Sequence, residues 1–125
     1  MESVLGLPLP DFMADEELAM FADSVERFIA DHLPPERMVS FRAKGMVDRA
    51  LWAQAGAAGL AGLSLPVEFG GAGGDFRHEV VLAEQLGRAG IEGWDITLHN
   101  AVVAPYIAAY GTDAQKRRWL PGVCS

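Results

Sequence analysis

The segment Gly111-Thr112-Asp113-Ala114-Gln115-Lys116-Arg117-Arg118-Trp119-Leu120-Pro121 decides the fold class, because it marks the end of one helix and the start of the next. Gly111 favours the left-handed backbone conformation that terminates a helix. Thr112, followed by Gln115 three residues later, has the pattern of a capping box. Pro121 is expected to end the second helix. Two helices that meet at a tight turn indicate a helical protein.

The rest of the chain repeats apolar residues every three to four positions, and no stretch shows the period of two that marks a strand. Helices are expected near residues 16–33, 47–58, 76–90, 94–110 and 112–120. Asp11 or Asp15 caps the first helix, Pro34-Pro35 ends it, and Asp75 caps the third. Residues 60–75 contain Pro66 and five glycines and are expected to be loop throughout. The sequence therefore predicts an all-α protein of about five helices in one domain over residues 1–125.

Composition excludes several classes of protein. The 125 residues are 50% hydrophobic and carry a net charge of −7, which argues against a nucleic-acid surface. Cys124 is the only cysteine, so no disulfide forms within the chain and a reducing compartment is expected. Residues 1–8 lack a basic signal region, and no apolar run reaches the ~20 residues of a membrane span. A soluble cytoplasmic protein with no membrane span and no nucleic-acid partner is expected.

The polar motifs also have plain structural interpretations. The glycine run 70–74 is followed by Asp75 and Phe76, where phosphate-binding loops need a lysine or a further glycine, so a tight turn is expected. The three histidines have no common spacing, so no metal site is expected. His78 is expected to be exposed. For His99, a buried imidazole bonded to a carbonyl is favoured over a ligand-facing role. Pro105 predicts a kink in the helix 94–110.

Three segments, taken together in their order and spacing, resemble one known family. They are Ser64-Leu65-Pro66-Val67-Glu68-Phe69-Gly70-Gly71, Leu98-His99-Asn100 and the capped segment 111–121. This combination resembles the N-terminal helical domain of the flavin-dependent acyl-CoA dehydrogenases. Residues 98–107 look most like the long-chain-type members.

The resemblance implies a fold in which this helical domain, an orthogonal bundle of about five helices, precedes a β-domain and a C-terminal four-helix bundle. It implies α,β-dehydrogenation of a medium- to long-chain acyl-CoA in fatty-acid β-oxidation, in which a glutamate takes the α-proton and FAD accepts the β-hydride. Both groups belong to the later domains of the family. The chain is therefore expected to stop before the β-domain, to hold no catalytic or FAD-binding residue, and to be inactive alone, with FAD and acyl-CoA bound by the full-length parent.

The resemblance also implies that the helix 94–110 lines the fatty acyl chain. A stripe of mixed polarity on this helix contains Asp95, Leu98, His99 and Val102, and Trp94 is expected near the deep end of the acyl site. We therefore predict that these five residues bind substrate. A second stripe, with Ile96, Val103 and Ile107, is expected to face the core of the domain.

The apolar residues of the last two helices exceed what a small bundle is expected to bury, so exposed apolar surface and a homo- or hetero-oligomer are predicted. These residues are Val103, Ile107, Tyr110, Trp119 and Leu120. Two alternative functions remain open. One is a non-catalytic helical interaction module or partner subunit, and the other is the helical domain of a related flavin monooxygenase or acyl-CoA oxidase.

Overall fold

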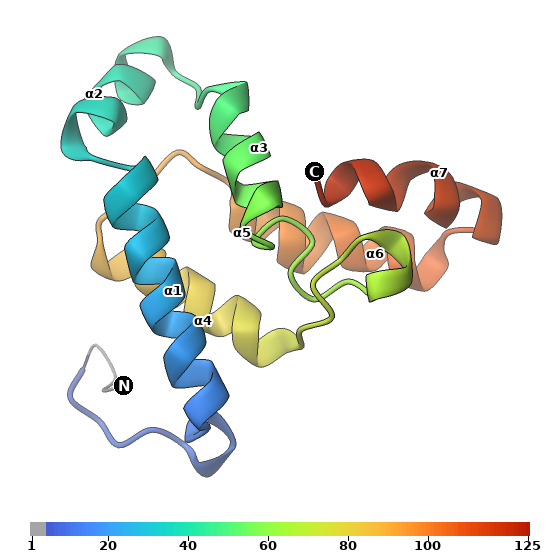
Figure 1. Ribbon diagram of the computed structural model, residues 1–125, viewed down its shortest axis with the longest axis horizontal. Helices are drawn as coiled ribbons and strands as arrows, with labels where there is room; N and C mark the ends of the chain where they lie inside the picture. The colour runs from blue at the N-terminus through green and yellow to red at the C-terminus, as the bar shows by residue number, and fades with distance from the viewer. Residues whose placement is uncertain (1–4) are drawn as a thin grey trace.

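The computed structural model describes residues 5–125, and no strand occurs among them, which confirms the all-α prediction (Figure 1). Two short 3-10 helices cover Asp11–Met13 and Val67–Phe69, and a π-helical turn covers His99–Val103. The α-helices are α1 (Glu16–His32), α2 (Pro35–Lys44), α3 (Arg49–Ala57), α4 (Phe76–Arg88), α5 (Ile96–Leu98), α6 (Ala104–Tyr110) and α7 (Asp113–Val123). Within the described part of the chain, no helix has the length and apolar character that crossing a membrane requires.

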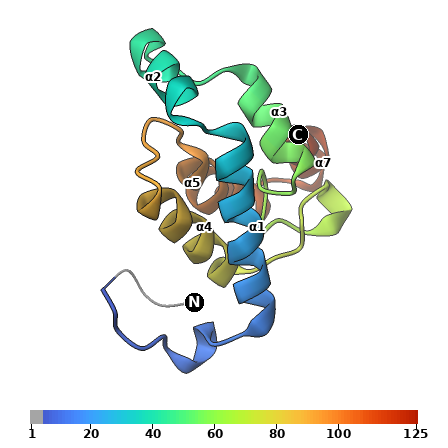
Figure 2. The ribbon, with the colours of Figure 1, turned by 60° about the vertical axis from the view of Figure 1, so that its left-hand side comes forward.

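Helices α1 and α4 pack across each other and form the centre of the domain (Figures 1 and 2). Asp15, not Asp11, caps α1, because its carboxylate accepts a hydrogen bond from the backbone N–H of Glu17 at 2.9 Å. The core buries Val25 of α1 and Leu82 of α4 completely. Each such side chain stabilises the fold by about 1.5–3 kcal/mol.

The start of α4 is capped as expected from Asp75. The Asp75 carboxylate accepts from the backbone N–H of Arg77 at 2.9 Å, and His78 Nδ1 accepts from the backbone N–H of Asp75 at 3.1 Å. A hydrogen bond from the Arg77 side chain is the main cause that lowers the pKa of Asp75 to about 2. The expectation that His78 is exposed is wrong, because its side chain closes this cap and is only 14% exposed.

Helix α2 was not expected, because Pro34 and Pro35 were interpreted only as the end of the first helix. Pro35 instead occupies the first turn of α2, where its missing N–H costs no hydrogen bond and its fixed φ suits the helix. Gly45 then ends α2 with a φ of +72°. The expected helix 47–58 is shorter than predicted and spans only Arg49–Ala57.

The expected helix 94–110 begins at Ile96 and contains an irregular turn in place of a simple proline kink. The backbone N–H of Ala104 bonds to the carbonyl of His99, five residues earlier, as in a π-helix. Pro105, which has no N–H to donate, follows directly. Because His99 and Ala104 keep helical backbone angles, α5, the π-helical turn and α6 form one continuous helical segment, which we call the π-rod.

The structure of residues 111–121, which join α6 to α7, is largely as expected. The Gln115 N–H donates to the Thr112 hydroxyl at 3.2 Å and the Thr112 N–H donates to the Gln115 side chain at 2.9 Å, which confirms the capping box. Two details are wrong. Gly111 is extended rather than left-handed, with φ −68° and ψ 153°. Pro121 lies inside α7, which continues to Val123.

The glycine-rich segment between α3 and α4 is a tight turn, as expected. A Cβ at Gly71 would overlap the carbonyl oxygen of Leu65, so no larger residue fits there without a shift of the backbone. The expectation of loop throughout is wrong at Val67–Phe69, which form a 3-10 helix after Pro66. The turn leads directly into α4, which begins at Phe76 (Figure 1).

Candidate functional site

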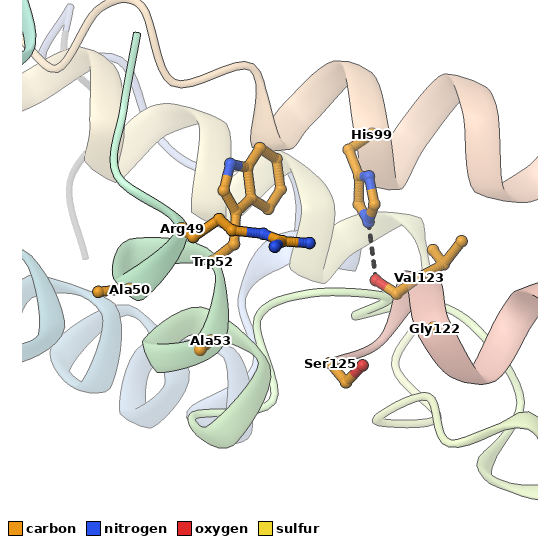
Figure 3. Close-up of a pocket in the computed structure, with 8 residues that line it drawn as sticks. All are labelled: Arg49, Ala50, Trp52, Ala53, His99, Gly122, Val123 and Ser125. Carbon is orange, nitrogen blue, oxygen red and sulfur yellow. Dashed lines mark hydrogen bonds between the residues drawn. The ribbon is translucent and has the colours of Figure 1, made fainter.

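A pocket of about 590 Å³ lies between α3, the π-rod and the end of α7 (Figure 3). Its lining is mostly apolar, with a few polar groups and no acidic side chain. The lining residues are Arg49, Ala50, Trp52, Ala53, His99, Gly122, Val123 and Ser125. Its volume falls in the range of small-molecule sites.

Aromatic rings form one side of this pocket. Trp52 of α3 lies with its ring centroid 5.0 Å from that of His99 and 6.0 Å from that of the buried Trp94. Trp94 is in turn stacked on Phe28 of α1 at 6.0 Å. The indole of Trp52 is therefore held by rings that reach into the core.

His99 joins the π-rod to the end of α7. Its Nε2 lies 2.7 Å from the carbonyl oxygen of Val123 (Figure 3). A carbonyl oxygen only accepts, so Nε2 is the donor in this hydrogen bond. The predicted carbonyl partner is confirmed, but His99 is half-buried and also lines the pocket.

Arg49 supplies the positive charge of the pocket. Its side chain extends over the pocket toward His99 and Val123 (Figure 3). Within residues 5–125 it makes no hydrogen bond or ion pair, whereas its neighbour Asp48 pairs with Lys44 at 3.3 Å. The guanidinium is thus free to bind an anion.

Asn100, the buried polar residue that follows His99, has a structural role that was not predicted from the sequence. The Asn100 amide donates to the carbonyl of Leu60 at 2.6 Å, and its carbonyl oxygen accepts from the N–H of Gly62 at 2.9 Å. Both partners lie in the loop after α3. Asn100 therefore holds that loop against the π-rod.

A second missed residue is Glu79 of α4, which is 3% exposed. One carboxylate oxygen accepts from the N–H of Ser64 at 3.2 Å, and the other has no hydrogen-bond partner among residues 5–125. Burial is the main cause that raises the pKa of Glu79, against contacts with Ser64 and Asn100 that lower it. The available signal was its spacing, since Glu79 shares the helix face of Leu82 and Leu86.

The five predicted substrate-binding residues are not all brought together. Trp94 is buried in the core, whereas Asp95, Leu98 and Val102 are exposed, Leu98 by 52% and Val102 by 45%. Only His99 of the five lines the pocket of Figure 3. Their contact with a substrate stays a prediction.

The expected division between core and exposed residues needs two corrections. Val103, expected in the core, is 46% exposed, because the extra residue in the π-helical turn changes which positions face inward. Leu120, one of the apolar residues expected to exceed what the bundle can bury, is 0% exposed, since it packs into a small cluster with Leu65 and Ala104. Tyr110 and Trp119 are exposed as expected.

The glycine turn does not fit the phosphates of FAD. The first N–H groups of α4 face the Asp75 carboxylate, which adds a negative charge where a phosphate would need a positive field. A Cβ at Gly74 would lie 2.9 Å from the carbonyl oxygen of Leu63. The glycines thus serve close backbone packing. Among the described residues, no group of three or more His, Cys, Asp or Glu side chains is arranged to hold a metal ion.

Comparison with known proteins adds independent evidence. The family model described as acyl-CoA dehydrogenase, N-terminal domain, matches residues 15–125. The long-chain specific acyl-CoA dehydrogenase of Sus scrofa mitochondria is 32% identical over 102 residues, which are 82% of this chain and 24% of that protein. The mitochondrial isovaleryl-CoA dehydrogenase of Pongo abelii is 29% identical over 123 residues, which are 95% of this chain and 29% of that protein.

A solved structure supports the same family. The crystal structure of an acyl-CoA dehydrogenase from Geobacillus kaustophilus matches 88% of this chain and 29% of that chain, with a TM-score of 0.81 and 34% identity. The chain thus spans about a quarter of the length of the curated relatives it matches. By its sequence and its helical fold, the chain belongs to the acyl-CoA dehydrogenase family and corresponds to its N-terminal domain.

Proposed function

We propose that this chain is part of an FAD-dependent enzyme that dehydrogenates the Cα–Cβ bond of a medium- to long-chain acyl-CoA. The observation that carries the proposal is the match of the family's N-terminal domain over residues 15–125. The long-chain specific relative and the segment Leu98-His99-Asn100 support the chain length. The isovaleryl-CoA relative is named for a much shorter acyl group, so chain length needs its own test.

In the proposed enzyme, the exposed face of the π-rod forms part of the wall around the acyl chain. Leu98 and Val102 are apolar and accessible, so contact with an acyl chain removes their surface from water. Asp95 and His99 lie at the polar margin of this wall. Trp94 supports it from the core, where Phe28 and Trp52 hold its ring.

The chemistry itself is assigned to other parts of the enzyme. FAD, when bound there, accepts the hydride, and the glycine turn of this chain does not fit its phosphates. Base, flavin and substrate must be placed to within about an ångström of one another. We therefore propose that this chain alone is inactive. A cytoplasmic location also stays a proposal, because the relatives named above include mitochondrial enzymes.

The proposal is tested with a full-length enzyme that contains this chain. We expect anaerobic palmitoyl-CoA to bleach the flavin absorbance, and an artificial electron acceptor to sustain turnover to the enoyl-CoA. Failure of every acyl-CoA from butyryl to palmitoyl to reduce the flavin would contradict the proposal. Rapid hydrogen peroxide formation in air would favour the acyl-CoA oxidase alternative. Turnover by the 125-residue chain alone would contradict the assignment of the chemistry to the other domains.

A further inference from the structure

We propose that the pocket between α3, the π-rod and α7 binds a small flat aromatic carboxylate. This site adjoins the acyl wall at His99, which lines it, whereas Leu98 and Val102 do not. The inference does not rest on the proposed function. It rests on three features of the pocket: the ring wall formed by Trp52 and His99, the positive charge of Arg49, and the volume left open beside Trp52.

The rings of Trp52, Trp94 and His99 contact one another beside the pocket. The indole of Trp52 meets Trp94 edge-on, with 75° between the ring planes, and lies at 53° to the imidazole of His99. The bond from His99 to the Val123 carbonyl fixes the imidazole in turn. A flat aromatic ligand can stack or pack edge-on here with little loss of side-chain freedom.

The guanidinium of Arg49 offers a binding group for an anion. Arg49 is the only charged side chain in the lining, and it has no partner within the described residues. Its nearest acidic neighbour in sequence, Asp48, is engaged by Lys44. A planar guanidinium matches the two oxygens of a carboxylate, so this group is the favoured anion.

The space suits a ligand of about two fused rings. Small residues leave the surface beside Trp52 open, because Ala50, Ala53 and Gly122 present at most a methyl group. The carboxylate would lie toward Arg49 and the rings against Trp52. Bulk added at the exposed Ala53 would occupy the same space.

The test uses 2-naphthoate as the probe and the 125-residue chain, with binding measured by calorimetry. We expect saturable binding at one site, and Arg49→Gln to weaken it about tenfold or more, because a hydrogen bond to a charged group is lost. The matched control Arg117→Gln removes an exposed arginine on α7 and should leave the affinity unchanged. The neutral analogue 2-naphthamide should bind as weakly as 2-naphthoate binds Arg49→Gln.

A second variant tests the space independently of the charge. Ala53→Leu should abolish binding without a loss of helical circular dichroism, because residue 53 is exposed and helical. The proposal is overturned if the wild-type chain shows no saturable binding. It is also overturned if Arg49→Gln binds as tightly as Arg117→Gln, if the amide binds as tightly as the acid, or if Ala53→Leu keeps full affinity.

Discussion

The side-chain amide of Asn100 donates a 2.6 Å hydrogen bond to the carbonyl oxygen of Leu60, forty residues earlier in the chain. The same side chain accepts from the N–H of Gly62. Asn100 is almost fully buried, so water cannot replace either bond. This one residue therefore ties the π-helical turn to the loop after α3.

Asn100→Ala should lower the free energy of unfolding by about 2–4 kcal/mol, because it leaves a buried N–H and a buried carbonyl unpaired. Chemical denaturation of the 125-residue chain measures the loss. Gln85→Ala on α4 is the control, because no side-chain hydrogen bond of Gln85 is present in the described residues. A loss as small as that of the control would show that the two bonds contribute little.

Glu79→Gln should make stability less dependent on pH. The pKa of Glu79 is raised in the folded chain, so the folded state holds its proton more tightly than the unfolded state. Stability from this group therefore falls as the pH rises above the unfolded pKa, and levels off above the folded pKa. A neutral amide avoids that loss.

The measurement compares urea unfolding of Glu79→Gln and wild type at pH 4.5 and pH 7.5. The variant should gain stability relative to wild type as the pH rises. Glu16→Gln, an exposed residue in the first turn of α1, is the control and should show no such gain. An equal difference between Glu79→Gln and wild type at both values of pH would refute a raised pKa.

Replacing Gly71 and Gly87 by alanine should change the free energy of unfolding in opposite directions. Gly71→Ala places a methyl group against the Leu65 carbonyl and should destabilise by about 2 kcal/mol or more, whereas Gly87→Ala has open space in α4. The second variant should stabilise by about 0.5–1 kcal/mol, because alanine is the better helix former. Thermal melting of both variants checks this. Similar melting temperatures would show that the glycine turn relaxes easily.

The 125-residue chain should self-associate. Val103, Tyr106, Tyr110 and Trp119 expose large apolar areas on the π-rod and α7. Burying such surface against a second copy is favourable. Sedimentation velocity at rising concentration should show a species larger than a monomer. A clean monomer that also fails to bind a hydrophobic dye would contradict this expectation.

Local features of the fold were predictable because they depend on neighbours in sequence. Thr112 and Gln115 form the expected capping box, and Asp75 caps α4. Pro35 misled the prediction, because a proline that ends one helix can equally begin the next. The same ambiguity hid α2.

The roles of Asn100 and Glu79 were not predictable, because their partners lie 15–40 residues away and depend on packing. Spacing separated Leu98 and Val102 from the stripe of the same helix that was expected to face the core, and both are exposed. The same spacing failed for Val103, since a π-helical turn shifts the register after it. The lack of a partner for Arg49 could not be predicted from the sequence, because it depends on which side chains lie nearby in the folded chain.

The most direct test of the proposed acyl wall is Leu98→Trp in the full-length enzyme, with kcat/KM measured from butyryl-CoA to palmitoyl-CoA. Leu98 is exposed in this domain, so added bulk should not disturb the core. We predict a fall of about tenfold or more for palmitoyl-CoA with butyryl-CoA almost unchanged, because bulk shortens the acyl site. Phe12→Trp, exposed near the N-terminus, should leave the profile unchanged. An equal loss at every chain length, with a lowered melting temperature, would contradict the account, because overpacking of a core costs about 1–3 kcal/mol whatever the substrate.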